Sequence, residues 1–149
     1  PIPMLTPAYS REIFQTNFVS KTHLVSALIK NKKISSPGRL INVSSISAHY
    51  GSKHVAIYSS SNAASESFMR SVGKAFLKKK ITVNSVAVNA IWTPVFEGLS
   101  ADNPVFNTPL GQGEVADVAN AVFFLCQKGS NFITGETLFL TGGQMEYDD

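Results

Sequence analysis

The strongest constraint on the fold is an alternation of short apolar runs with longer stretches of helical period. The runs are rich in β-branched residues and bounded by turn-forming residues, which is typical of strands buried in a sheet. Strands that are separated by crossover helices lie parallel to one another. The chain is therefore predicted to be α/β with a parallel sheet. The three strand-like runs cover residues 40–43, 81–88 and 136–140.

Three other stretches place apolar side chains at helical spacing, over residues 7–30, 58–79 and 115–126. In the second stretch Glu66 and Arg70 lie largely off the apolar stripe. Three strands are too few for a doubly wound domain, whose helices cover both faces of a larger sheet. We therefore interpret the chain as part of a larger domain.

Composition is that of an ordinary globular domain. The 149 residues are 44% hydrophobic and 15% charged, and the net charge of +3 is too small to favour a nucleic-acid surface. No apolar run is long enough to cross a membrane, and no signal-peptide pattern is found. Cys126 lies in an apolar helical pattern and is expected to be a buried structural thiol in a reducing compartment. We expect a cytoplasmic protein, and because the chain begins at Pro1, we also expect a missing upstream segment.

Two hydroxyl-bearing residues lie where a ligand site is expected. Ser45 follows the first strand-like run, and Tyr58 opens the next helix. Ligands of open α/β sheets bind at the carboxyl ends of the strands. A phenol and a hydroxyl brought together there could hold a carbonyl oxygen, with tyrosine as general acid and serine orienting the substrate. Serine and tyrosine are common near strand ends, so a structural role for the pair is the alternative interpretation.

Several motifs occur in the order and spacing of one enzyme family. They are Thr-Asn-Phe-Val-Ser around Asn17, the Ser45 and Tyr58 pair, the segment 81–94, and Thr-Gly-Gly at 141–143. Over nearly its whole length the chain resembles the short-chain dehydrogenase/reductase family. The resemblance implies a Rossmann-like, doubly wound parallel sheet, of which residues 1–149 supply the last three strands and their helices. These residues would then be the carboxyl-terminal part of a single domain.

The resemblance also implies roles for individual residues. Tyr58 takes the position of the catalytic acid/base, Ser45 that of the residue orienting the substrate oxygen, and Asn17 that of the asparagine completing a proton relay. Ile91 and Thr93 take positions that contact the nicotinamide of NAD or NADP. The glycine-rich turn that cradles the cofactor's pyrophosphate lies in the family's amino-terminal part, so the choice between the two cofactors is left open.

Three positions depart from the family pattern. The lysine expected four residues after the tyrosine is Asn62, which should lie beside Tyr58 and carries no charge to favour the phenolate. Val88 and Asn89 stand where the family has proline and glycine beneath the nicotinamide, so we expect a reshaped turn. Lys53 is an alternative cation, although a solvated loop lysine is the favoured interpretation.

The remaining candidates concern a lid and a metal. Residues 89–112 contain three prolines and no clear period, which predicts a loop that closes over the substrate. The histidines His23, His49 and His54 lack metal-ligand spacing and carboxylate neighbours, so no metal site is predicted.

Two functional hypotheses follow. In the first, the intact polypeptide uses NAD or NADP to interconvert an alcohol and a carbonyl on a small molecule, although the isolated segment is expected to be inactive. In the second, a catalytically degenerate relative is retained for oligomerisation or partner binding, as Asn62, Val88 and Asn89 suggest. The family's helices beginning near Pro7 and Tyr58 pack against a second subunit, which implies a homodimer or homotetramer. A stand-alone nucleotide-binding module has little support without a glycine-rich turn.

Overall fold

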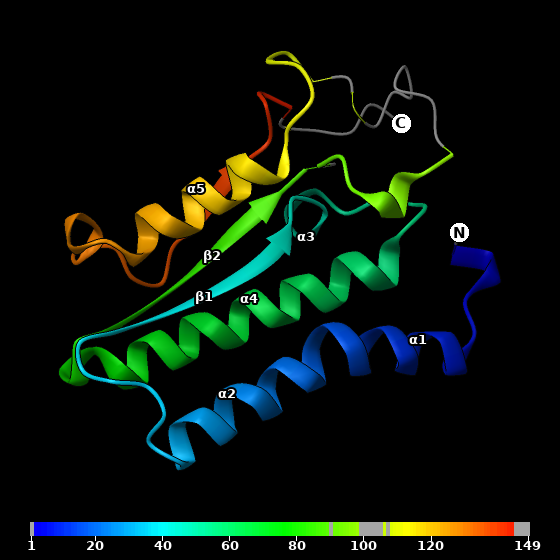
Figure 1. Cartoon of the computed structure of the whole chain (residues 1–149). Coiled ribbons are helices and arrows are strands. Elements are labelled where there is room, and N and C mark those ends of the chain that lie inside the picture. Colours follow the sequence, from blue (N-terminus) through cyan, green and yellow to red (C-terminus); the bar gives the residue numbers. More distant parts are fainter. Residues whose placement is uncertain (1, 90, 99–105, 107, 145–149) are drawn as a thin grey trace.

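The computed structural model describes residues 2–89, 91–98, 106 and 108–144. Within these ranges three strands form one parallel sheet in the order β1-β2-β3 (Figure 1). Strands β1 (Gly38–Ser45) and β2 (Ile81–Val88) pair along their whole length, so that both end at the same edge, and β3 (Thr137–Leu140) pairs with the second half of β2. The predicted α/β fold with three parallel strands is confirmed.

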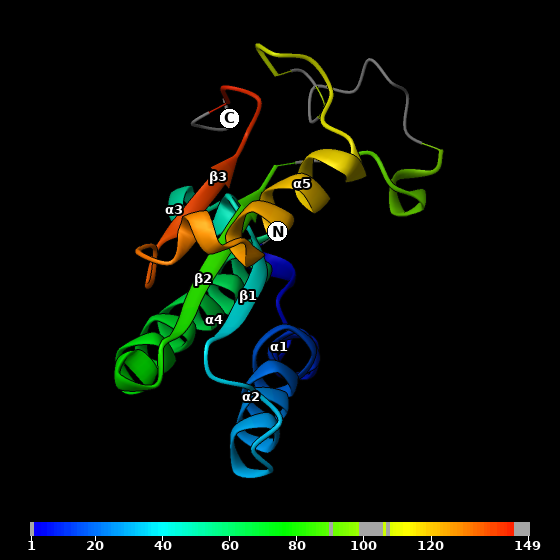
Figure 2. The same cartoon turned by 60° about the vertical axis from the view of Figure 1, so that its left-hand side comes forward.

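Helices cover both faces of the sheet (Figure 2). One face carries α4 (Ala56–Phe76) with α1 (Pro7–Phe14) and α2 (Ser20–Lys30), and the other carries α5 (Val115–Cys126). None of the helices in the described ranges is long and apolar enough to cross a membrane. The shorter helical elements are η1 (Ile2–Met4), η2 (Gln15–Val19), α3 (Ser47–Tyr50), η3 (Leu77–Lys79), η4 (Pro94–Phe96) and η6 (Lys128–Ser130).

Strand β2 is the centre of the core, because successive side chains of a strand point to opposite faces of the sheet. Ile81 and Val83 contribute to a cluster with residues of α2 and α4, whereas Val86 packs against α5. All residues of β2 except the last are buried. The apolar run thus forms the middle strand between two helical layers.

The stretch 7–30 is helical throughout, but the predicted single helix is interrupted. Its start is as predicted, with Pro7 in the first turn and the Thr6 hydroxyl accepting a hydrogen bond from the Tyr9 amide at 3.2 Å. At η2 the chain forms a π-helical turn, in which the Ser20 amide bonds to the Gln15 carbonyl. A π turn accommodates one extra residue per turn, and the spacing of apolar residues did not reveal it.

The prediction for Cys126 is wrong, because this thiol is exposed. Leu125 is 2% exposed and points into the core. Each step along an α-helix rotates the side chain by about 100°, so the next residue faces away from the sheet. The four-residue helix α3 was also not predicted, since it lies in the serine-rich segment after β1.

Candidate active site

Ser45 is the last residue of β1 and lies buried at the carboxyl edge of the sheet. Its Oγ accepts a hydrogen bond from the Ser47 amide at 3.3 Å and lies 3.0 Å from the Ser47 hydroxyl. The next amide, of Ile46, donates to the Val88 carbonyl at 3.0 Å and so joins the ends of β1 and β2. When the Ser47 hydroxyl donates, Ser45 keeps its own proton for another acceptor.

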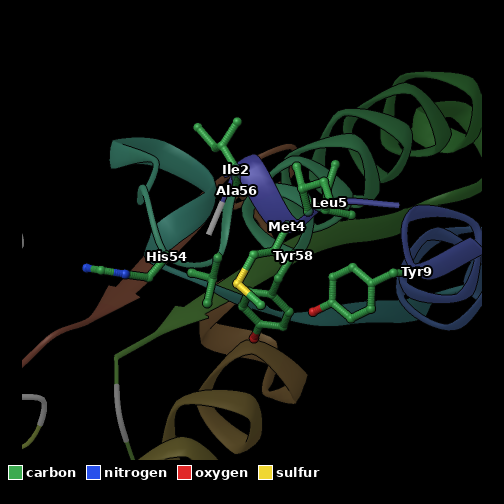
Figure 3. A pocket seen from close by; sticks show the side chains of 9 residues that line it. Ile2, Met4, Leu5, Tyr9, His54, Ala56 and Tyr58 are labelled. Atoms are coloured by element: carbon green, nitrogen blue, oxygen red, sulfur yellow. The ribbon is translucent and has the colours of Figure 1, made fainter. Parts of the chain in front are cut away.

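Tyr58 lies in the first turn of α4, and this helix begins on the side of the sheet where β1 and β2 end (Figure 1). Its side chain is partly exposed and lines a pocket of about 200 Å³ together with Tyr9 (Figure 3). A cavity of about 150 Å³ can hold benzene, so this pocket has room for a small molecule. Its walls are mostly apolar, and the lining residues are Ile2, Met4, Leu5, Tyr9, His54, Val55, Ala56, Ile57 and Tyr58.

Asn17 lies in the middle of the π turn η2 and reaches the helix that carries Tyr58. Its Nδ2 donates to the Ser61 hydroxyl at 3.1 Å, and that hydroxyl donates to the Tyr58 carbonyl at 2.7 Å. Ser61 is completely buried. The structure therefore brings Asn17 and the backbone of Tyr58 together through one intervening side chain.

Asn62 is buried one turn after Tyr58, as the helical spacing predicts. Its Nδ2 donates to the Tyr58 carbonyl at 3.1 Å, so the amide folds back onto its own helix. This position contributes a neutral hydrogen-bond donor. The alternative cation, Lys53, lies in the exposed part of the loop between α3 and α4.

Val88 and Asn89 continue the sheet instead of forming a glycine-like turn. Val88 pairs with Leu140, and the Asn89 amide donates to the Leu140 carbonyl at 3.0 Å. Asn89 is buried and its φ is not in the left-handed region, so asparagine takes this position without backbone strain. Its Nδ2 also donates to the Gln144 side chain.

The two other predicted cofactor residues follow in the next segment. Ile91 forms an isolated parallel bridge with Gly113, where an added Cβ would lie 2.7 Å from the Ile91 side chain. Thr93 precedes η4 in an extended conformation, with no side-chain capping bond. Asn89 and Ile91 line a second pocket, of about 290 Å³, at the ends of β2 and β3, whereas Val88 and Thr93 do not.

The predicted lid, residues 89–112, lies partly outside the described residues, at 90, 99–105 and 107. Its described part contains an aromatic cluster around Phe106, which is 4% exposed. The rings of Trp92 and Phe96 meet the Phe106 ring edge-on, at centroid distances of 5.2 and 5.1 Å.

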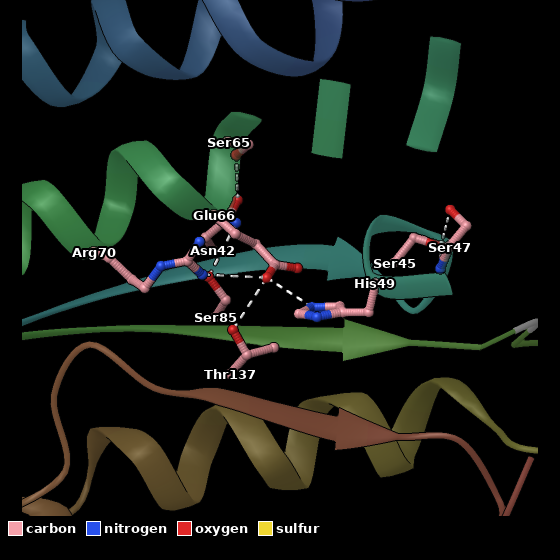
Figure 4. A network of polar contacts seen from close by, with 9 residues as sticks. All are labelled: Asn42, Ser45, Ser47, His49, Ser65, Glu66, Arg70, Ser85 and Thr137. Atoms are coloured by element: carbon pink, nitrogen blue, oxygen red, sulfur yellow. Dashed lines mark hydrogen bonds and ion pairs between the residues drawn. The ribbon is translucent and has the colours of Figure 1, made fainter. Parts of the chain in front are cut away.

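A polar network beneath the site was missed by the sequence analysis (Figure 4). His49 was predicted to lack a carboxylate neighbour, but its Nε2 lies 2.8 Å from Glu66 Oε2. Glu66 is 1% exposed although it lies off the apolar stripe, because α4 buries polar residues against the sheet. Thr137 on β3 donates to the same oxygen at 3.1 Å. The spacing of Tyr58, Asn62 and Glu66, each four residues apart on one helix, is the signal that could have indicated this polar side.

Comparison with known proteins identifies the family. A family described as enoyl-(acyl carrier protein) reductase matches residues 1–145. The chain belongs to the short-chain dehydrogenase/reductase family. Among curated short-chain dehydrogenase/reductase relatives, 3-oxoacyl-(acyl-carrier-protein) reductase FabG of Haemophilus influenzae is 35% identical over 136 residues, which cover 89% of this chain and 56% of the relative. The chain spans about half the length of the curated relatives it matches.

Solved structures of this family have the same fold. Angucycline C-6 ketoreductase LanV with bound NADP superposes with a TM-score of 0.89 at 24% identity, covering 96% of this chain and 56% of that chain. A 4-hydroxyisoleucine dehydrogenase mutant complexed with NADH and succinate has a TM-score of 0.87 at 24% identity, covering 97% and 62%. These likenesses confirm the predicted partial Rossmann-like sheet.

Within the described ranges, the pocket at the ends of β2 and β3 and the turn from β1 into α3 can be compared with the two ends of a nicotinamide dinucleotide. The pocket at Asn89 and Ile91 has room for a nicotinamide-sized ring, since it exceeds a benzene-holding cavity of about 150 Å³. The described turn from β1 into α3 has the sequence Ser45-Ile46-Ser47, which lacks the glycines that bring a backbone close to a pyrophosphate. No group of three or more potential metal ligands occurs among the residues that the structure describes.

Proposed function

We propose that this chain supplies the substrate-binding part of an NAD(P)-dependent oxidoreductase that interconverts an alcohol and a carbonyl on a small molecule. The observation that carries the proposal is the placement of Ser45 and of the first turn of α4 on the side of the sheet where β1 and β2 end, with Tyr58 lining an apolar pocket. Membership of an oxidoreductase family supports it. A fold alone does not define a reaction, so the proposal depends on these side chains.

In the proposed reduction, Ser45 and Tyr58 donate hydrogen bonds to the carbonyl oxygen of the substrate. NAD(P)H, held near Asn89 and Ile91, would supply the hydride for the carbonyl carbon. As negative charge develops on the oxygen, Tyr58 transfers its phenolic proton to it as a general acid, and in the oxidation it takes the proton back. Asn17, through Ser61, holds the turn of α4 that carries Tyr58.

The lining of the pocket supports a small substrate with an apolar body. We place the nicotinamide near Asn89, Ile91, Val88 and Thr93. We propose that residues 89–112 form the lid that closes over the substrate. We also propose that the protein is cytoplasmic and forms a homodimer or homotetramer. Its cofactor is proposed to be NAD or NADP.

The proposal is tested by Tyr58→Phe in the full-length protein. General acid catalysis contributes about 10²- to 10⁴-fold, so we expect kcat for carbonyl reduction to fall by at least about 100-fold. The matched control is Tyr50→Phe, which removes the same atom from a tyrosine at the end of α3. Turnover is measured as NAD(P)H absorbance loss with a panel of small ketones and aldehydes. A Tyr58→Phe protein that reduces them at the native rate would contradict the assigned role.

A second candidate, a relative that has lost its chemistry, is favoured by Asn62. A lysine at this position would add a cation one turn from Tyr58, where the buried amide now bonds to the Tyr58 carbonyl. The candidate predicts that the native protein reduces no carbonyl, although its site keeps Ser45 and Tyr58.

The substitution Asn62→Lys separates the two candidates. We expect it to raise kcat by about tenfold or more, since a nearby cation assists ionisation of the phenol during proton transfer. Asn62→Met, which lengthens the side chain without charge, is the control and is expected to give no gain. Activity that appears only in Asn62→Lys would favour lost chemistry. Ordinary native turnover would instead exclude it.

A further inference from the structure

The two candidate catalytic residues are joined by a segment that includes a largely exposed loop. Ser45 ends β1 and Tyr58 opens α4, and α3 and the loop 51–55 lie between them. Most side chains of this loop are exposed, and Gly51 takes a φ of 72°. Exposed loops with few buried contacts open easily. A contact that fixes the relative position of the two hydroxyls is therefore expected outside this loop.

Such a contact joins α3 directly to α4 (Figure 4). His49 Nε2, on α3, lies 2.8 Å from the Glu66 carboxylate, on α4. The His49 ring also meets the Phe139 ring of β3 edge-on, with centroids 4.7 Å apart. Thr137, also on β3, donates to Glu66 at 3.1 Å. The imidazole and the carboxylate are thus each held by a second contact from the sheet.

Burial makes this contact consequential. Glu66 is 1% exposed, and its Oε1 has no hydrogen-bond partner within the described part of the chain. Burying a carboxylate without enough partners raises the free energy of the folded state. The contacts made by the other oxygen of Glu66 therefore matter for the stability of this region. Besides Thr137, these include Arg70 at 3.7 Å, whose side chain is 47% exposed. The His49 nitrogen, at 2.8 Å, is therefore closer to the Glu66 carboxylate than the Arg70 guanidinium is.

The contact completes a short series of interactions that links the two candidate catalytic residues. Ser45 bonds to Ser47, which lies on the same four-residue helix as His49. Glu66 lies two turns after Tyr58 on the rigid helix α4. We propose that His49 and Glu66 are positioning residues that fix Ser45 relative to Tyr58. This inference rests on the proposed function.

The test is His49→Phe in the full-length protein. Phenylalanine keeps a ring against Phe139 but removes the nitrogen that contacts Glu66. A misplacement of about 1 Å can lower a rate by about 100-fold, so we expect kcat to fall at least about tenfold. KM is expected to stay within about twofold, because the lost positioning acts on the transition state.

A second measurement does not depend on turnover. Hydrogen exchange is measured for the His49 amide of α3, which bonds to the Ile46 carbonyl, and for the capping Gly51 amide, which bonds to the Ser47 carbonyl. Both rates are expected to accelerate at least about tenfold in His49→Phe. If the native protein reduces no carbonyl, the proposed function fails while the exchange measurement still tests the contact between α3 and α4. Native exchange rates in His49→Phe would overturn the inference, whatever the activity.

Two further variants make the test specific. His49→Gln places an amide nitrogen near the former Nε2 and is expected to restore kcat and exchange to within about threefold of native. Arg70→Gln removes the other ion pair of Glu66, which joins two residues of α4, and is expected to change neither quantity. A loss in Arg70→Gln equal to that in His49→Phe would mean that only the charge balance of Glu66 matters, and would overturn the positioning role.

Discussion

Lys21 joins the helical layer to the edge of the sheet. Its Nζ donates to the Asn42 side chain at 2.8 Å and to the Val43 carbonyl at 3.1 Å. The Asn42 side chain in turn accepts a hydrogen bond from Ser65 and donates one to Ser85. Side chains from α2, α4 and β2 thus meet at the amide of this β1 residue. Burial lowers the pKa of Lys21 below its ordinary value of 10.5, and the carboxylate of Glu66 offsets part of this effect.

The lowered pKa predicts a pH dependence of stability. In the window below pH 10.5, the unfolded chain binds the Lys21 proton more tightly than the folded chain does. The contribution of this group to the free energy of unfolding therefore rises as pH increases through the window. We expect the native protein to gain stability relative to Lys21→Met between neutral pH and about 10, as measured by urea denaturation. The exposed Lys74→Met is the control, and parallel profiles for native and Lys21→Met would contradict the prediction.

Candidate site residues could be predicted from the sequence only where they belong to a motif with a recognisable spacing. Ser45, Tyr58 and Asn17 were predicted as site residues because their spacing resembles that of the family, and their roles stay predictions. The contact between His49 and Glu66 was not, because it joins two elements through a polar pair that apolar periodicity does not register. Burial of Glu66 depends on how α4 lies on the sheet, which is a property of the assembled layers.

Helix α5 shows what an element's own pattern can predict. Its bounds agree with the prediction, because its apolar stripe is regular and Glu114 and Asp117 form a capping box at its start. Its contact with the sheet is narrow, since Ala121 and Leu125 are its buried residues. Helix α3 has too few residues for any period, so it could not be predicted in the same way.

The narrow contact of α5 makes one leucine important for stability. Leu125 is 2% exposed and belongs to the cluster around Val86. We expect Leu125→Ala to lower the free energy of unfolding by about 2–5 kcal/mol, because it leaves a cavity between helix and sheet. Asn120→Ala, at an exposed position of the same helix, should change it by less than about 0.5 kcal/mol. Chemical denaturation measures both, and equal losses would mean that α5 is held by something other than this cluster.

At the scale of the whole molecule, the sheet has a core on each face and an open side at β1. In the ranges that the structure describes, β1 pairs with β2 alone, and Val43 on β1 is 48% exposed. An edge strand with free amides and carbonyls is a template for further pairing. The chain covers 56% of the FabG relative and 56% of the LanV structure, so the fold seen here is somewhat more than half of theirs. The partial sheet was predicted because three strands cannot support a doubly wound domain.

The π turn at Gln15–Val19 sets the rotational phase between α1 and α2. If the same residues wound as a regular α-helix, α1 would be rotated by about 100° about its axis relative to α2. Tyr9 would then leave the wall that it shares with Tyr58 in the pocket, while α2 and Lys21 stayed in place. The winding of this turn is thus part of the geometry of the site, and a change from π to α winding would alter the pocket without altering any residue that lines it.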